Sequence, residues 1–131
     1  MSNDSNKELV VSSWMAIADG EIGKFLSNVH DDIQWEILGE HPFSGVMRGP
    51  DDVLNKLLLP LGDLLDGGLA MNVSTATAEG GRVVMEVQGT SRTANGKDYN
   101  NNYCIVVELK DGKIHRVREY TDTYLIVRTF S

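Results

Sequence analysis

The chain has 131 residues, of which 41% are hydrophobic, and a formal net charge of −7. This length predicts one domain over residues 1–131 with a core of its own, and the single cysteine, Cys104, excludes an internal disulfide or a zinc site built on cysteines. No run of Lys or Arg could neutralise phosphates, which argues against nucleic acid and anionic membrane surfaces as partners. No segment comes near the roughly 18 consecutive apolar residues of a membrane span, and the polar N-terminus lacks a signal core, so we expect a soluble, cytoplasmic protein.

The first half of the chain has the spacing of helices. Residues 1–6 are expected to be a disordered lead, followed by a helix from Lys7 to Asp19-Gly20 and a second short helix over residues 21–29. Ile33, Trp35 and Ile37 then alternate with polar residues, which predicts a strand. A third helix begins at Gly49-Pro50 and runs to about residue 65, and Pro60 should kink or split it.

The second half changes to strands separated by turns. Alternating residues predict a strand over 71–77, and the next ones span Arg82–Arg92 and Tyr99–Leu109. The Asp111-Gly112 turn leads into a last, long strand from Lys113 to about Val127. Three helices before a run of strands indicate an α+β fold, with the helices packed on one face of a strongly bent antiparallel sheet.

Such an arrangement leaves a concave apolar pocket, so polar residues that interrupt its strands are candidates for function. In the last strand, alternation places Arg118, Tyr120, Asp122 and Tyr124 on one face. A buried carboxyl between tyrosines would have a raised pKa, which suits a general acid or base. Alternatively, Asp122 caps the end of the strand or pairs with Arg118.

Other polar candidates lie on neighbouring segments. Glu86 and Gln88 share one face of their strand; Glu86 is a second acid/base candidate if that face points inward, and a solvated residue if it points outward, which is the commoner arrangement. Glu36 lies in the first predicted strand and His41 in the loop that follows, where a histidine could transfer protons or simply be exposed. No histidine pair has the spacing of a metal site, so we expect no metal.

A third group of polar side chains lies on the strand after Asn95-Gly96. Tyr99, Asn101 and Tyr103 share one face and could bind a ligand oxygen or form an ordinary cross-strand ladder.

Three segments of the C-terminal half carry a resemblance. The sequences GKDYNNNY (96–103), LKDGKI (109–114) and REYTD (118–122) resemble the SnoaL-like group of the NTF2-like superfamily, which includes polyketide cyclases, ketosteroid isomerase-related proteins and relatives of limonene-epoxide hydrolase. The resemblance implies a cone of three helices and a bent sheet, a homodimer, and an acid/base role for Asp122. It places Glu36 near the base of ketosteroid isomerase. It also places Glu86 and Gln88 where the epoxide hydrolases have an Arg-x-Asp pair, which counts against that reaction.

The favoured hypothesis is a cyclase or isomerase without a cofactor, in which Asp122 moves a proton at a carbon beside a carbonyl of a small apolar oxygenated ligand. Glu36 or Glu86 would be the second carboxylate, and a neutral donor would stabilise the enolate. The alternative is a non-catalytic ligand-binding or dimeric interaction domain, and an epoxide hydrolase is the least favoured. Val84, Val106 and Val117 would form the outer, dimer-forming face of the sheet. The predicted catalytic residues are Asp122, Glu36 and Glu86, and the predicted ligand-binding residues are Trp14, Trp35, His41, Phe43, Leu57, Leu58, Gln88, Asn101, Tyr103 and Tyr120.

Overall fold

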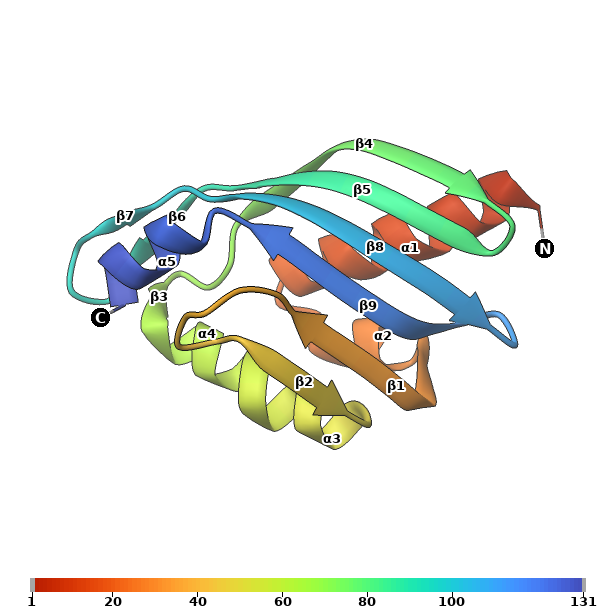
Figure 1. The fold of residues 1–131 in the computed structure, drawn as a ribbon, viewed down its shortest axis with the longest axis horizontal. Helices are drawn as coiled ribbons and strands as arrows, with labels where there is room; N and C mark the ends of the chain where they lie inside the picture. The colour runs from red at the N-terminus through yellow and green to blue at the C-terminus, as the bar shows by residue number, and fades with distance from the viewer. Residues whose placement is uncertain (1, 131) are drawn as a thin grey trace.

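A computed structural model describes residues 2–130 and contains helices and a strongly curved sheet, as the sequence predicted for the α+β class (Figure 1). The helical segments are α1 (Asn3–Ala18), α2 (Ile22–Leu26), α3 (Pro50–Val53), the π-helix η1 (Leu54–Leu58), α4 (Leu59–Leu64) and α5 (Thr123–Phe130). The strands are β1 (Val29–Ile37), β2 (Gly45–Arg48), β3 (Leu65–Asp66), β4 (Met71–Glu79), β5 (Arg82–Gly89), β6 (Ser91–Thr93), β7 (Asp98–Tyr99), β8 (Asn102–Lys110) and β9 (Lys113–Thr121).

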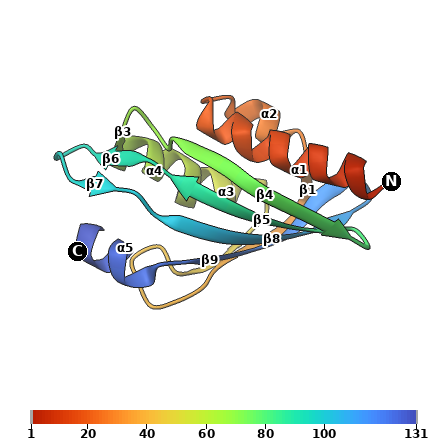
Figure 2. The same cartoon turned by 90° about the horizontal axis from the view of Figure 1, so that it is seen from above.

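Helix α1 begins earlier than the sequence predicted. The Ser2 side chain accepts a hydrogen bond from the Ser5 backbone N–H and caps the helix, so residues 3–6 are helical and not a disordered lead. Met1 lies outside the described residues. Figure 2 shows the helix along one face of the sheet. There it contacts β4 and β5 and buries Val10 and Trp14.

The third helical segment continues through Pro60, which lies in the first turn of α4. Proline has no N–H for the helical ladder, and its ring crowds the carbonyl of the preceding turn. The segment just before Pro60 is the π-helix η1, in which the N–H of Leu59 donates to the carbonyl of Leu54. The wider hydrogen-bond spacing lets the chain pass Pro60 without a break in the helical path from Pro50 to Leu64.

The main sheet has the order β2-β1-β9-β8-β5-β4 and a second, small sheet has the order β3-β6-β7. Neighbouring strands are antiparallel except β1 and β9, which are parallel, so the main sheet is mixed and the prediction of a purely antiparallel sheet was wrong.

The two long strands predicted around Asn95-Gly96 are each broken in two. The breaks fall opposite each other, at Thr90 and at residues 100–101, and a hydrogen bond of 2.8 Å from the Gly89 N–H to the Asn101 carbonyl joins them. Beyond the breaks, β6 and β7 form a hairpin that leaves the main sheet and pairs with β3.

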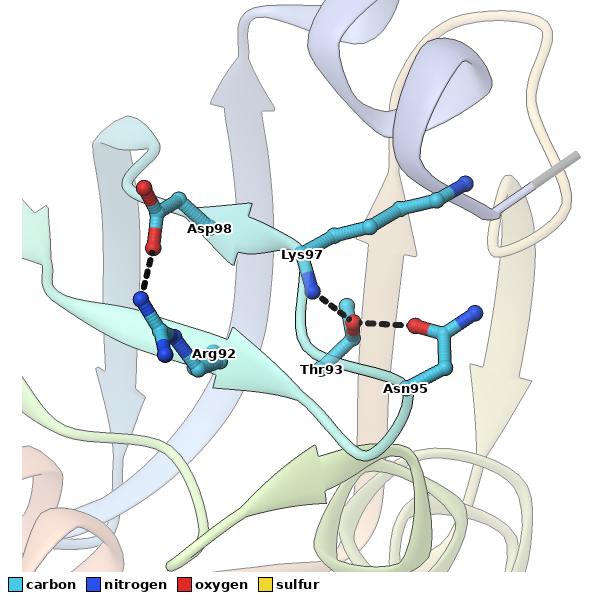
Figure 3. A network of polar contacts seen from close by, with 5 residues as sticks. All are labelled: Arg92, Thr93, Asn95, Lys97 and Asp98. Carbon is cyan, nitrogen blue, oxygen red and sulfur yellow. Dashed lines mark hydrogen bonds and ion pairs between the residues drawn. The ribbon is translucent and has the colours of Figure 1, made fainter.

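Polar side chains hold this hairpin together (Figure 3). Arg92 and Asp98 form an ion pair of 3.2 Å across the two strands. At the turn, the Thr93 hydroxyl donates to Asn95 and accepts from the backbone N–H of Lys97. The Lys97 ammonium also donates to the carbonyl of Thr129, which links the hairpin to α5.

The last predicted strand ends earlier than expected. Strand β9 stops at Thr121 and the chain turns into α5, whose first turn is capped by a 3.2 Å hydrogen bond from the Leu125 N–H to the Asp122 carboxylate. The prediction of a strand to about Val127 was therefore wrong, because Asp122 begins a helix. Figure 1 shows α5 beside the β6–β7 hairpin, at the far end of the sheet from the N-terminus.

A bulge also changes which residues of β9 face inward. Ile114 pairs with Leu109 and Arg116 pairs with Glu108, which leaves His115 as an extra residue. Ile114 is buried before the bulge, and Val117 is buried after it at 1% exposure. Val117 therefore belongs to the core, and its predicted place on the outer face was wrong.

Candidate functional site

The concave face of the sheet and the helices that cover it enclose an apolar cavity. Its volume is about 570 Å³, including the mouth that opens to solvent. Most of the wall is apolar, and the polar groups come from Trp35, His41, Tyr99, Tyr103 and Glu119. The remaining lining residues are Trp14, Ile17, Ile37, Phe43, Leu57, Leu58, Leu61, Leu69, Met71, Val87, Ile105 and Ile126.

Glu119 is the one carboxyl among the described residues that line this cavity. On β9 it lies between Ile37 of β1 and Ile105 of β8, so apolar neighbours flank it on both sides. Burial raises the pKa of Glu119 from 4.5 to about 7, and the nearby indole N–H of Trp35 offsets part of this rise. Because Glu119 keeps some accessible surface and lines the cavity, its carboxyl is available to a ligand. A carboxyl that titrates near neutral pH can both accept and return a proton.

Two tyrosines form a hydrogen-bonded pair in the same cavity. The Tyr103 hydroxyl donates to the Tyr99 hydroxyl oxygen over 3.1 Å, and the Asn101 amide donates to the same oxygen over 3.2 Å. Burial raises the pKa of Tyr99, and these two hydrogen bonds oppose part of that rise. Burial also raises the pKa of Tyr103 far above its ordinary value. Both phenols are therefore neutral donors at physiological pH.

Two further nitrogen atoms of the lining are buried and have no hydrogen-bond partner among the described residues: Nε1 of Trp35 and Nε2 of His41. The His41 Nδ1 accepts the backbone N–H of Phe43 over 3.1 Å, so in the neutral ring Nε2 carries the proton. Burial lowers the pKa of His41 and favours that neutral ring, although the carbonyl of Leu38 acts in the opposite direction. Buried polar groups without partners are uncommon and indicate that something else satisfies them.

The cavity contains seven of the predicted site residues. Trp14, Trp35, His41, Phe43, Leu57, Leu58 and Tyr103 all line it. Asn101 does not line it but is buried at 1% exposure, where it binds Tyr99 and both backbone polar groups of Asp122. Asn101 therefore holds the cavity tyrosine in place and contributes no atom to the lining.

The three predicted catalytic carboxyls lie elsewhere. Asp122 is exposed and caps α5. Glu86 is exposed on the outer face, where it accepts a 2.9 Å hydrogen bond from Thr75. Glu36 is on the same face and lies 3.9 Å from Arg118. None of the three contributes to the cavity lining.

Two residues of the predicted ligand-binding set also lie outside. Gln88 follows Glu86 on the outer face of β5, since Val83, Met85 and Val87 take the inner one. Tyr120 is 41% exposed on the outer face of β9. Gln88 was assigned to the wrong face of β5, and Tyr120 was assigned to the wrong face of β9 because the bulge at His115 was not detected.

Glu119 was missed because the bulge at His115 reverses the alternation. Counting by two from the buried Ile114 selects Arg118, Tyr120 and Asp122, whereas the structure turns Val117 and Glu119 inward. Val117 could have indicated the bulge from the sequence. It is an apolar residue between Arg116 and Arg118, and it lies three residues after Ile114, so simple alternation cannot place both apolar side chains on the same face.

Neither a metal cluster nor a membrane-spanning helix is found between residues 2 and 130. No group of three or more His, Cys, Asp or Glu side chains in that range could hold a metal ion. No helix in the same range is long and apolar enough to cross a membrane.

A protein-family model described as the SnoaL-like domain matches residues 11–117, so the chain belongs to the SnoaL-like family. The matched region ends two residues before Glu119. Among curated proteins, the uncharacterized protein Rv0034 of Mycobacterium tuberculosis is 25% identical over 123 residues, covering 92% of this chain and 91% of that protein.

Two solved structures illustrate the fold. An NTF2-like protein from Burkholderia xenovorans superposes with a TM-score of 0.83 at 24% identity, over 100% of this chain and 99% of that one. TerC, co-crystallised with polyporic acid, superposes with a TM-score of 0.78 at 24% identity, over 95% of this chain and 97% of that one. Together with the family match, they establish the NTF2-like fold that the sequence predicted.

Proposed function

We propose that the protein is a cofactor-independent enzyme of the cyclase or isomerase type, with Glu119 as the acid/base for a small apolar carbonyl substrate. The observation that carries the proposal is a single carboxyl, with its pKa raised to about 7 by burial, in an apolar cavity that also contains neutral hydrogen-bond donors. Membership of the SnoaL-like family supports a ligand pocket of this kind. The role first given to Asp122 passes to Glu119, because Asp122 is exposed and caps α5.

The proposed reaction begins with removal of a proton from the carbon next to the substrate carbonyl. The C–H bond breaks and an O–H bond forms on the Glu119 carboxylate, while the electron pair moves through the new C=C bond onto the carbonyl oxygen. Glu119 then returns the proton to another carbon of the enolate in an isomerisation. In a cyclisation the enolate carbon instead attacks a second carbonyl of the same substrate, whose oxygen receives the proton. The substrate carbonyl takes up the electrons, so no cofactor is required.

The tyrosine pair would stabilise the enolate oxygen. Since the Tyr99 oxygen already accepts hydrogen bonds from Tyr103 and Asn101, its own O–H is free to donate to a ligand. As negative charge develops on the ligand oxygen, the hydrogen bond that the Tyr99 hydroxyl donates to it becomes stronger. The two hydrogen bonds that the Tyr99 oxygen accepts stabilise the negative charge that this hydroxyl then gains. Donors fixed in a water-poor site typically supply a large part of such a rate enhancement.

Deuterium exchange tests this proposal without knowledge of the natural substrate. Small uncharged cyclic ketones, including β,γ-unsaturated ketones, are incubated with the protein in D₂O, and the loss of the α-proton signal is followed by NMR. Glu119→Gln should slow exchange by roughly 10²- to 10⁴-fold. The matched controls Asp122→Asn and Glu36→Gln should keep the wild-type rate. Exchange that survives in Glu119→Gln, or is lost in Asp122→Asn, contradicts the proposal.

The non-catalytic alternative gives a different result in the same experiment. A ligand-binding domain would bind members of the panel, detected as shifted ligand signals, but would exchange none of them above the buffer rate. Binding with no exchange by the wild-type protein would therefore favour a carrier.

We also propose that the outer face of the sheet pairs two copies of the chain in a homodimer. Val46 and Tyr120 are exposed on this face at 45% and 41%. The partly exposed Val84 and Val106 are paired on the same face, and Glu36 and Arg118 lie between them and Val46. Exposed apolar side chains grouped on one face are typical of association surfaces. Sedimentation velocity at micromolar concentration should give a dimer for the wild type and a monomer for Val106→Glu. A monomeric wild type contradicts the pairing.

A further inference from the structure

No lysine or arginine is among the described residues that line the cavity. Its titratable groups are His41 from the β1–β2 connection, Tyr99 and Tyr103 from β7 and β8, and Glu119 from β9. The arginine nearest to Glu119 in sequence, Arg118, is on the opposite face of β9 and lies 3.9 Å from Glu36. An anionic ligand would therefore find no counter-charge inside, and transfer of a charge from water into an apolar site is strongly unfavourable without one.

One strong donor in the lining has no partner within hydrogen-bond distance. Trp35 is 2% exposed, and its Nε1 has no partner at that distance among the described residues. The acceptor that the indole N–H approaches is the Glu119 carboxylate, and this interaction lowers the pKa of Glu119. An indole N–H can only donate, so it requires an oxygen or another acceptor. A ligand oxygen beside Glu119 would satisfy it.

The aromatic walls of the cavity suit a flat ring. Trp14 of α1 and Trp35 of β1 lie with their ring centroids 5.4 Å apart and their planes tilted by 39°. Phe43 and Tyr99 also line the cavity, and each packs edge-to-face on Phe130 of α5, at 5.2 and 4.9 Å between ring centroids. Several aromatic side chains in one apolar wall favour a planar, ring-containing ligand.

We propose that this cavity selects an uncharged, planar, ring-containing ligand by one carbonyl oxygen that accepts a hydrogen bond from Trp35 Nε1, and that it excludes carboxylates of the same shape. The inference rests on the proposed use of the cavity as the substrate site and names the class of ligand it takes. Trp35 thereby acquires a polar role in addition to the apolar one expected from the sequence.

Charge selection should depend on pH through Glu119. Between pH 6.5 and 8.5 the tyrosines stay neutral because burial raises their pKa values, and His41 stays mostly neutral because burial lowers its pKa. Only Glu119, with its pKa near 7, changes charge among the titratable lining groups in this interval. Ionised Glu119 repels an anion and attracts a cation, so raising the pH should weaken anion binding further and favour a cationic analogue.

Calorimetric titration with four naphthalene probes tests the inference by affinity and not by turnover. The probes are 2-acetylnaphthalene, 2-naphthoate, 2-naphthylmethylammonium and 2-methylnaphthalene, which share a ring system and differ in charge and in the oxygen. At pH 8.5 the ketone should bind at least about tenfold more tightly than naphthoate, since an unpaired charge costs more than one lost hydrogen bond. Lowering the pH to 6.5 should reduce the difference in affinity between the ketone and naphthoate, and it should weaken the binding of the ammonium probe. In Glu119→Gln the affinities of both charged probes should no longer depend on pH in this interval.

Trp35→Phe isolates the hydrogen bond. The variant should bind 2-acetylnaphthalene roughly five- to thirtyfold more weakly, the range of one or two buried hydrogen bonds. It should bind 2-methylnaphthalene, which has no oxygen, within about twofold of wild type, and this second probe also reports that the variant is folded. Equal binding of naphthoate and ketone at pH 8.5 overturns the inference, as does an equal loss for both probes in Trp35→Phe. Tight ketone binding without deuterium exchange would leave the inference intact and contradict the catalytic proposal alone.

Discussion

Both faces of the curved sheet carry carboxyl groups, but those on the outer face are solvated and the one on the inner face is surrounded by apolar walls. Strand β9 contributes to both: Glu119 points into the cavity between Ile37 and Ile105, and its neighbour Arg118 points outward, 3.9 Å from Glu36. Water and an opposite charge surround the outer carboxyl, whereas the inner carboxyl has only hydrogen-bond donors and apolar walls. Position in the fold therefore separates a carboxyl with a raised pKa from an ordinary one.

The comparison also explains why the acidic composition says little about the site. The first 66 residues contain 12 acidic and 4 basic side chains, and residues 67–131 contain 7 and 8. Most of the acidic excess is thus in the half that forms the first four helices and the first hairpin. Asp51 and Glu40 are examples from this half whose side chains are exposed to solvent. Glu119 comes from the nearly balanced half. Burial of one carboxyl matters more for chemistry than the net charge of the chain.

The largest effect that should distinguish the two faces is the pH dependence of stability. The pKa of Glu119 is raised in the folded protein, so the folded state binds the proton more tightly than the unfolded state. Stability contributed by the protonated carboxyl is complete below the unfolded pKa, near pH 4.5, and is lost as pH rises through about 7. A shift of this size corresponds to roughly 3 kcal/mol. Relative to wild type, Glu119→Gln should gain about this much unfolding free energy between pH 4.5 and pH 8.5.

Urea denaturation at several pH values measures this difference directly. Glu36→Gln is the matched control from the outer face, since its carboxyl is partly exposed and its ion pair with Arg118 is long and solvated. This control should follow the wild-type curve within about 0.5 kcal/mol at every pH. Parallel curves for wild type and Glu119→Gln would mean that the inner carboxyl is as well solvated as the outer one.

Much of the fold could be predicted from the sequence because its signals are local. The spacing of Val10, Trp14 and Ile17 predicts α1, and Asp111-Gly112 predicts the turn between β8 and β9. The apolar half of the cavity followed from the same patterns, since residues such as Trp35 and Leu57 that repeat in step with an element face its core.

The polar half of the site depends on features that local patterns do not contain. The bulge at His115 becomes visible only when β9 is paired with β8, and it exchanges the faces of the residues that follow. The helical role of Asp122 depends on α5 packing Ile126 and Phe130 against Tyr99 and Leu65, which are distant in sequence. The tyrosine pair requires the break at Asn101, where the strand leaves the main sheet.

Two adjacent asparagines offer a smaller test of the same contrast. Asn101 is 1% exposed; its amide donates to the Tyr99 hydroxyl and to the Asp122 carbonyl, and its side-chain oxygen accepts the N–H groups of Asn102 and Asp122. Asn102, the next residue, is exposed. Asn101→Ala should cost about 2 kcal/mol of unfolding free energy because it leaves buried polar groups unpaired, and Asn102→Ala should cost less than about 0.5 kcal/mol.

Denaturation of both variants measures that difference, and hydrogen exchange locates it. Loss of Asn101 removes the link between the β7–β8 connection and the backbone of Asp122, just before α5. The amides of α5 should therefore exchange faster in Asn101→Ala, while those of α1 should keep their wild-type rates. The Tyr99 hydroxyl would also lose one of the two hydrogen bonds it accepts, so Asn101→Ala should slow deuterium exchange of a bound ketone more than Asn102→Ala does. Equal effects from the two substitutions would show that the break between β7 and β8 does not position Tyr99, and the cavity would then hold its tyrosines by packing alone.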